Sequence, residues 1–256
     1  MNNKTVLCVG PHPDDAEFQC AGTLALLADK GWEIHIATMT PGDVGSAKLS
    51  REEISQIRRI EASKSVAILK GTYHCLECDD MFIMYDRETL LKATELLRKV
   101  QPSIVITSSP SDYIVDHETT STLVRSACMA ASIPNIETSG VSPCGNVPYL
   151  YYFDPIQGKD IMGKEIASSI IVDITSTFDI KKEMLCCHKS QRNWLFEISK
   201  MDDYVIMMED YARKKGREIN SNYAEGFRQH LGLNYPTENI LKSELTSYLY
   251  EIPISE

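Results

Sequence analysis

The 256-residue chain has no apolar run close to the roughly 20 residues that a membrane-spanning helix requires. Its opening residues, MNNKTVLCVG, also lack the long apolar segment of a secretory signal. Lysine and arginine form no long runs, and the formal net charge is −10. Because nucleic-acid binding usually requires a basic surface, that class of partner is disfavoured. These absences predict a soluble, cytoplasmic protein with neither a membrane nor a nucleic-acid partner.

A disulfide framework is not expected either. Eight cysteines are scattered through a chain without an export signal, so most should be small buried apolar residues. Cys75 and Cys78, in HCLECDD, resemble half of a zinc site or a redox pair. A structural zinc site needs a second pair of ligands, and the remaining cysteines offer no matching pair. We therefore interpret this segment as a loop that follows a short strand.

The composition predicts one folded unit. Hydrophobic residues make up 43% of the chain, which is ample for a substantial core. No repeat, low-complexity segment or convincing linker divides the sequence. We expect a single domain over residues 1–256 with a carboxy-terminal extension, and the sequence does not decide whether residues beyond Tyr149 cap a site or extend the sheet. An isologous homo-oligomer is a reasonable alternative to a monomer.

Predicted strands and helices alternate along the chain. The strands are expected at Thr5–Gly10, Glu33–Met39, Pro102–Ser109, Tyr149–Asp154 and Ser168–Thr175. The helices are expected at Ala21–Lys30, Ser50–Leu69, Glu88–Val100, Ser176–Lys189 and Asp202–Gly216. This alternation is typical of a mostly parallel α/β sheet flanked by helices.

Two predicted loops carry the residues with chemical potential. In an open parallel sheet, ligands bind beyond the carboxyl ends of the strands, near the point where strand order reverses. The first loop, in VGPHPDDAEFQCAG, follows the first strand and holds His12, Asp14, Asp15 and Glu17. The second, SSPSDYIVDHETT at residues 108–120, adds Asp112, Asp116 and His117. A polar surface turn is the alternative for the first loop, and the second loop makes that alternative less favoured.

His12, Asp15 and His117 together would supply two imidazoles and one carboxylate. Three protein ligands of this kind plus a water form a common catalytic zinc site, with iron(II) as an alternative metal. Adjacent loop residues point in different directions, so Asp14 would be free to take a proton from the water. The pattern thus predicts a metal site with a separate catalytic carboxylate.

These segments resemble a known family. Pro11–Glu17 is similar to the PHPDDxE signature of the zinc-dependent N-acetylglucosaminyl deacetylases, the PIG-L or LmbE-like family. Asp112-Tyr113 and Asp116-His117 fall where that family carries its DYxxDH segment. Further similar segments are IRRIEASKSVAILKG (57–71), HKSQ (188–191) and AEGFR (224–228). The resemblance covers most of the chain.

The resemblance implies a Rossmann-like fold and hydrolysis of a carbon–nitrogen bond other than a peptide bond. The partner would be a small acylated amino sugar, such as an N-acetylglucosamine conjugate, that loses its N-acyl, usually N-acetyl, group. By position, His12, Asp15 and His117 would bind one zinc ion per chain. Asp14 would be the general base that later protonates the leaving amine, and Asp116 would orient a neighbouring group.

One position departs from the family pattern. Many members carry a histidine three positions before the second-motif zinc ligand, where it is thought to stabilise the oxyanion, and here that position is Ile114. Losing one oxyanion donor costs on the order of 100- to 1000-fold in rate. We predict that His188 replaces it, with Tyr113 as the second candidate. Among Arg51, Arg58 and Arg59, Arg51 is the candidate for binding a substrate carboxylate or phosphate, a solvated helix face being the alternative for all three.

Two further functions stay open at this point. The enzyme could hydrolyse another small acylated amine, such as a thiol-cofactor precursor. The chain could instead be a catalytically impaired metal- or sugar-binding protein, because Ile114 removes a donor. A nucleotide-binding protein is disfavoured, since the first loop lacks GxGxxG and places carboxylates where phosphates would sit.

Overall fold

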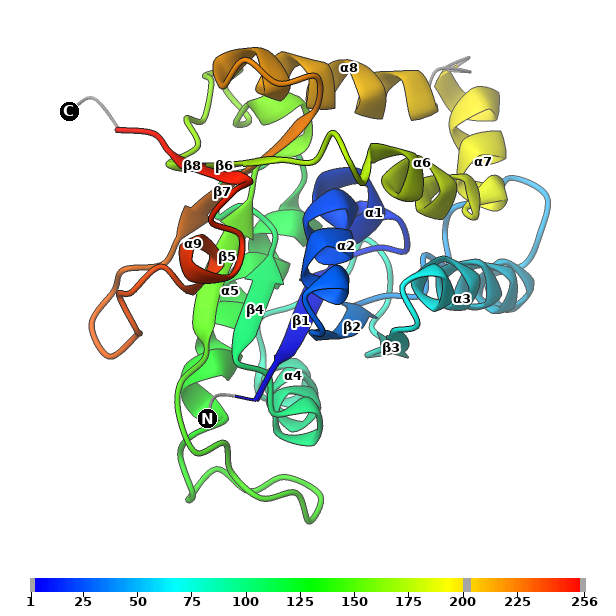
Figure 1. Ribbon diagram of the computed structural model, residues 1–256. Helices are drawn as coiled ribbons and strands as arrows, with labels where there is room; N and C mark the ends of the chain where they lie inside the picture. The colour runs from blue at the N-terminus through cyan, green and yellow to red at the C-terminus, as the bar shows by residue number, and fades with distance from the viewer. Residues whose placement is uncertain (1–2, 200–203, 254–256) are drawn as a thin grey trace.

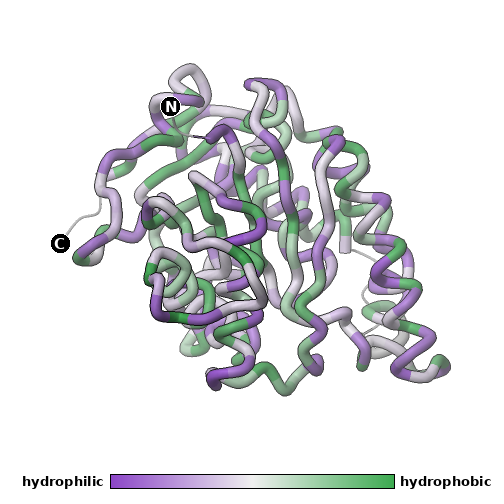
Figure 2. The backbone as a smooth tube through the Cα atoms, turned by 90° about the horizontal axis from the view of Figure 1, so that it is seen from below, coloured by the Kyte–Doolittle hydropathy of each residue, from purple (hydrophilic) through white to green (hydrophobic). Residues whose placement is uncertain are grey.

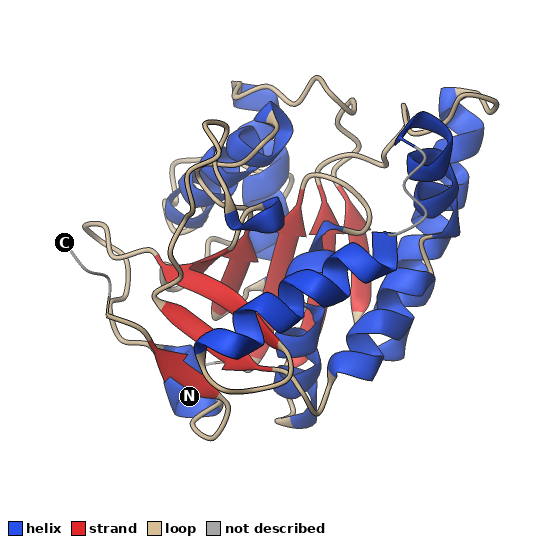
Figure 3. Ribbon diagram, turned by 90° about the horizontal axis from the view of Figure 1, so that it is seen from above, coloured by secondary structure: helices blue, strands red, loops and turns tan. Residues whose placement is uncertain are grey.

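The computed structural model of the protein describes residues 3–199 and 204–253. In this part of the chain, eight strands form one sheet with helices against both faces (Figure 1, Figure 3). The strands are β1 (Thr5–Gly10), β2 (Glu33–Thr38), β3 (Thr72–Cys75), β4 (Ile104–Thr107), β5 (Tyr149–Phe153), β6 (Ile170–Asp173), β7 (Ala224–Gln229) and β8 (Leu249–Glu251). The α-helices are α1 (Asp15–Gln19), α2 (Ala21–Asp29), α3 (Arg51–Ile68), α4 (Arg87–Val100), α5 (Val115–Ala130), α6 (Phe178–Cys186), α7 (Lys189–Ser199), α8 (Tyr204–Glu218) and α9 (Ile240–Glu244).

The sheet is parallel on one side and antiparallel on the other. Its strand order is β3-β2-β1-β4-β5-β7-β6-β8. The five strands from β3 to β5 are parallel, whereas β7 runs antiparallel to both β5 and β6, and β8 runs antiparallel to β6. The predicted fold class, a mostly parallel sheet flanked by helices with a carboxy-terminal extension, is confirmed.

The strand order reverses between β1 and β4. From β1 the chain proceeds outward to β2 and β3, and it later returns to place β4 on the other side of β1. Such a reversal opens a crevice at the carboxyl ends of the two central strands. The segment 11–14 after β1 and the segment 108–114 after β4 both start at this crevice.

The core lies in two layers, one on each face of the sheet. Val6 and Cys8 of β1 belong to a cluster with side chains of α2, α6 and α8, whereas Leu7 and Val9 pack with α4 and α5. The alternation follows from the two-residue period of a strand. Figure 2 shows hydrophobic stretches in the central strands and mixed hydropathy along the helices. No helix in the described ranges is long and apolar enough to cross a membrane.

The predicted elements match well where local signals are strong. Ser50 accepts a hydrogen bond from the Glu53 amide (3.3 Å), and the Ser50 amide donates to the Glu53 carboxylate (2.9 Å). This capping box starts α3 where the sequence predicts it. Strands β1, β2, β4, β5 and β6 all lie within their predicted ranges.

Two expectations about segment boundaries need correction. The loop predicted over residues 108–120 ends at Ile114, because α5 begins at Val115 and carries His117 in its first turn. The helix predicted over 176–189 ends at Cys186, so His188 lies between α6 and α7. The predicted start of the following helix at Asp202 lies outside the described residues, and α8 is described from Tyr204.

Candidate active site

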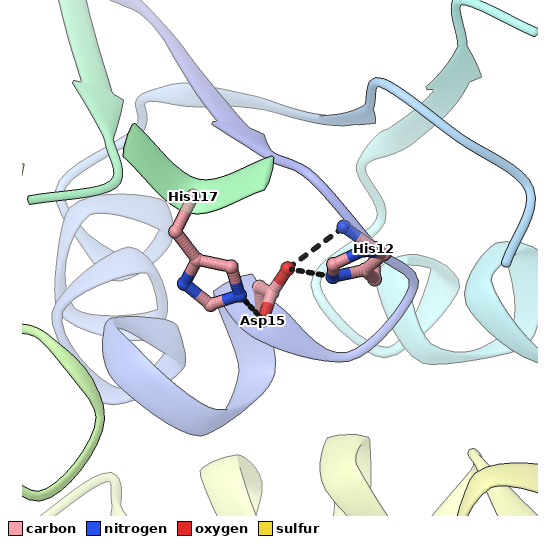
Figure 4. A group of neighbouring side chains, drawn as sticks. All are labelled: His12, Asp15 and His117. Atoms are coloured by element: carbon pink, nitrogen blue, oxygen red, sulfur yellow. Dashed lines mark hydrogen bonds and ion pairs between the residues drawn. The ribbon is translucent and has the colours of Figure 1, made fainter. Parts of the chain in front are cut away.

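Three side chains from two segments converge at the crevice. His12 lies in the turn after β1, Asp15 is the first residue of α1, and His117 lies in the first turn of α5. Figure 4 shows the two imidazole rings on either side of the Asp15 carboxylate. The fold therefore brings together the residues that the sequence predicts as metal ligands.

The geometry of these groups fits a divalent metal ion. His12 Nδ1 lies 3.4 Å from Asp15 Oδ2, and His117 Nε2 lies 3.4 Å from Asp15 Oδ1. One ligand atom from each residue lies within 4.8 Å of the other two. His117 Nε2 is buried and has no hydrogen-bond partner among the described residues, as expected for a nitrogen that coordinates a metal. Imidazole and carboxylate donors suit zinc, and iron(II) shares this preference.

Neighbouring carboxylates orient both imidazoles. Asp112 Oδ2 lies 2.9 Å from His117 Nδ1, and this contact leaves Nε2 facing Asp15. On His12, Nε2 lies 3.1 Å from Asp80 Oδ1 and 3.3 Å from Asp116 Oδ2, which leaves Nδ1 facing Asp15. Carboxylates on the distal nitrogen fix the tautomer of a metal-binding histidine.

Asp80 and Asp116 could in principle form a second cation group with His12. However, Asp116 Oδ2 also accepts the backbone N–H of Met81 at 2.8 Å. The nitrogen that these carboxylates face is the one opposite Asp15. We therefore assign them to the orientation of His12, in agreement with the orienting role that the family resemblance implies for Asp116.

The local charges favour a bound cation. Burial lowers the pKa of His12, but hydrogen bonds with Asp116, Asp15 and Asp80 outweigh it and raise that pKa well above its usual value. Burial also opposes ionisation of Asp15, yet His117 and His12 hold its pKa at about 2. The carboxylates that attract protons to the imidazoles would equally attract a metal ion.

Asp14 stands apart from this group. Its φ of 115° is in the left-handed region, and its carboxylate is outside the group with metal-ligand geometry. Burial raises the pKa of Asp14 to about 6, although the charge of Arg58 opposes this shift. Tyr204 donates a hydrogen bond to Asp14 Oδ2, and Arg58 Nη2 lies 3.8 Å from Oδ1.

Arg58, one of three arginines that the sequence offered for anion binding or for a solvated helix face, is instead a buried structural support. It is 2% exposed and donates hydrogen bonds to the carbonyl oxygens of Pro13 (2.9 Å) and Gly42 (3.2 Å). Gly42 has a φ of +70°, and a Cβ there would lie 2.3 Å from Arg58 Nη1. The glycine-containing loop after β2 thus lets Arg58 reach the backbone next to Asp14.

His188 lies behind the site rather than on its surface. It is 1% exposed, and its Nε2 lies 3.1 Å from Glu17 Oε1. Glu17 also accepts a hydrogen bond from Ser65 at 2.7 Å. His188 does not belong to the described lining of the cavity at the metal ligands. Its role as an oxyanion donor stays a prediction, and its contacts favour a role in holding Glu17.

The other two predicted site residues lie on different surfaces. Tyr113 is 57% exposed, lines the cavity, and has its ring 5.3 Å from that of His117. Arg51 lies outside the cavity lining and pairs with Asp43 and Asp79. Asp43 in turn accepts the backbone N–H of Asp80 at 3.0 Å. Substrate binding by Arg51 stays untested, and its contacts favour support of the loop that holds Asp80.

The cavity above the metal ligands has a volume of about 550 Å³. Its floor is made by His12, Asp14 and Asp15. The walls come from α1, the loop after β4, the segment after β5, and helices α7 and α8, through Phe18, Tyr113, Ile156, Gln157, Lys159, Asp160, Ile161, Gly163, Gln191, Leu195, Tyr204 and Met207. The carboxy-terminal part of the chain therefore covers the site as well as extending the sheet.

Cys75 and Cys78 are not part of a group with metal-ligand geometry among the described residues. Cys75 ends β3 and Cys78 follows it in a loop, as predicted. Burial raises the pKa of the Cys75 thiol and raises that of Cys78 to about 11. In the described ranges, the groups with metal-ligand geometry contain neither residue.

The chain is similar to known deacetylases. Residues 7–128 match the family model for PIG-L, GlcNAc-PI de-N-acetylase. Diacetylchitobiose deacetylase of Thermococcus kodakarensis is 28% identical over 242 residues, covering 88% of this chain and 82% of that protein. The structure of N,N'-diacetylchitobiose deacetylase from Pyrococcus horikoshii is 29% identical with a TM-score of 0.77, covering 91% of this chain and 86% of that one.

A relative with a different activity is also similar. 4-Oxalmesaconate hydratase of Pseudomonas putida is 28% identical over 201 residues, covering 74% of this chain and 75% of that protein. The family-model match nevertheless includes both segments that supply His12, Asp15 and His117. That match shows a PIG-L, or LmbE-like, domain over residues 7–128, and the chain shares its fold with the deacetylase structure above.

Proposed function

We propose that this protein is a metal-dependent hydrolase that removes an N-acyl group, most often acetyl, from an amino sugar such as an N-acetylglucosamine conjugate. The observation that carries the proposal is that Asp14 lines the cavity beside His12 and Asp15 but lies outside the His12, Asp15 and His117 group with metal-ligand geometry. Hydrolysis of an amide needs both a group that polarises the carbonyl and a base that activates water.

His12, Asp15 and His117 would hold the metal, with zinc as the first choice and iron(II) as the alternative. When bound, the ion would polarise the amide carbonyl and lower the pKa of the attacking water. Asp112, Asp80 and Asp116 keep the two imidazoles aimed at Asp15. These three carboxylates would thereby set the metal affinity.

Asp14 would perform the proton transfers. Its pKa of about 6, raised by burial, lies near neutrality, where a carboxyl group can both accept and return a proton. It would take a proton from the attacking water and return it to the nitrogen as the carbon–nitrogen bond breaks. Tyr204 and Arg58 fix the carboxylate for this task.

The oxyanion donor would come from the cavity wall. Ile114 cannot donate a hydrogen bond from its side chain, and His188 faces Glu17. The Tyr113 hydroxyl is the remaining sequence-predicted donor, and its ring lies edge-on to the ring of His117. We favour Tyr113 over His188 on this ground.

A hydratase activity is the second candidate, because one relative at 28% identity is 4-oxalmesaconate hydratase. The name of that substrate denotes a carboxylate-rich anion. In this chain, Asp14, Asp15 and Asp160 line the cavity, and among its described lining residues Lys159 is the one lysine or arginine. A neutral acylated amine suits this balance of charge better than a polyanion does.

The test is a substrate panel with the zinc-reconstituted protein. Release of a primary amine from N-acetylglucosamine, diacetylchitobiose and N-acetylglucosaminyl conjugates would be measured beside hydration of 4-oxalmesaconate. The proposal expects amine release with no hydration. Hydration without amine release would replace it by the hydratase function, and metal binding without either reaction would favour the binding-protein alternative.

A further inference from the structure

The outer wall of the active-site cavity differs in chemistry from its floor. The floor carries His12, Asp14 and Asp15, whereas large apolar side chains form much of the wall. These are Phe18, Ile156, Ile161, Leu195 and Met207. They come from α1, the segment after β5, α7 and α8, so the apolar wall is assembled from four parts of the chain.

A short hairpin after β5 places one of these side chains at the cavity mouth. The backbones of Lys159 and Glu165 form an antiparallel β-bridge across this hairpin. The Asp160 side chain accepts hydrogen bonds from the backbone N–H groups of Met162 and Lys164, both at 2.9 Å. These bonds fix the tip, where Ile161 is 67% exposed and Met162 is 84% exposed. Ile161 lines the cavity, and Met162 is outside its lining.

Few charges on the wall could hold an anionic group. Lys159 is the one lysine or arginine among the described lining residues. Asp160 follows it directly with the opposite charge, and Gln157 and Gln191 are neutral. An uncharged ligand group therefore meets less electrostatic opposition here than a carboxylate or phosphate would.

The cavity is also larger than one sugar ring requires. Its volume of about 550 Å³ lies well within the range of sites that bury drug-sized ligands, roughly 300–1,000 Å³. An N-acetylated hexosamine with its amide at the floor would leave the wall formed by Ile156, Ile161, Leu195 and Met207 uncovered. That surface needs an apolar partner to exclude water.

We propose that this wall binds an uncharged alkyl or aryl aglycone, so that the substrate is an N-acylated amino sugar with an apolar group at its anomeric position. The inference rests on the proposed function, because it places the amide at the floor beside Asp14. Ile161 is then a specificity-determining residue at the outer end of the aglycone site. Burial of one methylene would raise kcat/KM about fourfold at most.

The experiment compares methyl and n-hexyl glycosides of N-acetylglucosamine with the zinc-reconstituted enzyme. We expect kcat/KM for the hexyl glycoside to exceed that for the methyl glycoside by about tenfold or more. Ile161→Asn should reduce this ratio severalfold. Met162→Asn, on the same hairpin and outside the cavity lining, is the matched control and should preserve the ratio.

A binding measurement separates this inference from the proposed function. Each glycoside is titrated into metal-free protein, where no turnover interferes, and the hexyl glycoside should bind more tightly by a similar factor. Tighter hexyl binding without amine release would support the apolar site and overturn the proposed hydrolysis. Equal rates of amine release from the methyl and hexyl glycosides, together with equal binding of the two, would overturn the apolar site but not the proposed hydrolysis. Preference for a carboxyalkyl glycoside over the hexyl glycoside would do the same.

Discussion

Asp14 and Asp15 are adjacent carboxylates with opposite electrostatic surroundings. Burial raises the pKa of Asp14 to about 6, whereas His117 and His12 overcome burial and hold the pKa of Asp15 at about 2. The Asp14 carboxylate contacts Tyr204 and Arg58, whereas the Asp15 carboxylate faces His12 and His117. A pair of carboxyl groups whose environments drive their pKa values apart is typical of a site that assigns them different tasks.

Tyr204→Phe tests how Asp14 is held. The change removes the hydroxyl that donates to Asp14 Oδ2 and leaves the ring, which lies 5.8 Å from that of Phe18. A hydrogen bond to a charged group contributes about 1.5–3 kcal/mol, so kcat should fall roughly 10- to 100-fold. Zinc content and KM should stay close to wild type. An unchanged kcat would show that the Tyr204 hydroxyl does not hold Asp14 in place for catalysis.

Asp112→Asn tests the support of His117. The amide can present its NH₂ group to Nδ1, which would favour the wrong tautomer for a nitrogen ligand at Nε2. Loss of such a partner typically lowers metal affinity or activity by about 10- to 100-fold. Competition with a zinc chelator measures the affinity. Asp29→Asn, at an exposed carboxylate at the end of α2, is the control and should bind zinc as wild type does.

The grouping of His12, Asp15 and His117 could be predicted from the sequence, but several of the residues that contact this group could not. His12, Asp14 and Asp15 are dense within one short segment, and His117 follows a second strand at the same sheet edge. Tyr204, by contrast, lies 190 positions from Asp14, and an isolated tyrosine carries no local signal. Asp80 likewise reaches the site only through the packing of the loop after β3, where it contacts His12. Such contacts depend on the order of strands in space.

At the scale of elements, β7 shows why local patterns were insufficient. Its sequence, AEGFRQ, contains a glutamate, a glycine and an arginine, which are unusual in a buried strand. Glu225 is 3% exposed because it pairs with Lys181 at 2.6 Å and accepts the backbone N–H groups of Gly22 and Thr23. Tertiary contacts stabilise what strand propensity alone disfavours.

Helices and strands whose signals are local could be predicted without knowledge of tertiary contacts. The capping box of Ser50 and Glu53 is complete within four residues, so it marks the start of α3 without tertiary information. Helix α5 lacks such a mark, since Ile114 at its N-cap makes no side-chain cap hydrogen bond. The sequence therefore indicated a loop across the start of α5.

Gly226→Ala tests the packing of β7 against β5. A Cβ at this position would lie 2.1 Å from Asp154 Oδ2 and 2.4 Å from Ser168 Oγ, two buried groups that bond to each other at 2.6 Å. We expect the free energy of unfolding to fall by about 1–3 kcal/mol. Gly145→Ala, where a Cβ meets nothing within 4 Å, should leave it nearly unchanged. Denaturant unfolding measures both, and equal stabilities would contradict the packing argument.

His74 on β3 makes the edge of the sheet sensitive to acid. Its Nε2 lies 2.9 Å from His35 Nδ1, and burial, followed by the charges of His35 and Lys99, lowers its pKa to about 4. Glu33 faces the other nitrogen of His35. Below a pH of about 6.5 the unfolded chain binds a proton at His74 that the folded chain does not, so stability falls toward pH 4.

The check is denaturant unfolding of wild type and His74→Gln at pH 7 and pH 5. Wild type should lose more stability on acidification than the variant, because glutamine cannot take up the proton. Parallel losses in both proteins would show that His74 does not contribute to the acid sensitivity.

At the scale of the whole molecule, the carboxy-terminal part completes the site. Residues 7–128 contain the proposed metal ligands and Asp14, whereas the apolar wall and Tyr204 come largely from the segment after β5 and from α7 and α8. Glu225 and Lys181 bind the backbone of α1 and α2 from β7 and α6. One part of the chain thus carries the chemistry and the other shapes the cavity.

The most direct test of this account measures bound zinc and amine release for wild type and Asp14→Asn. Both proteins should bind about one zinc ion per chain, because Asp14 is not a ligand. Amine release by the variant should fall by about 100-fold or more, the scale of general acid–base catalysis. Failure of both proteins to bind metal after reconstitution, or release by the variant at the wild-type rate, would contradict the account.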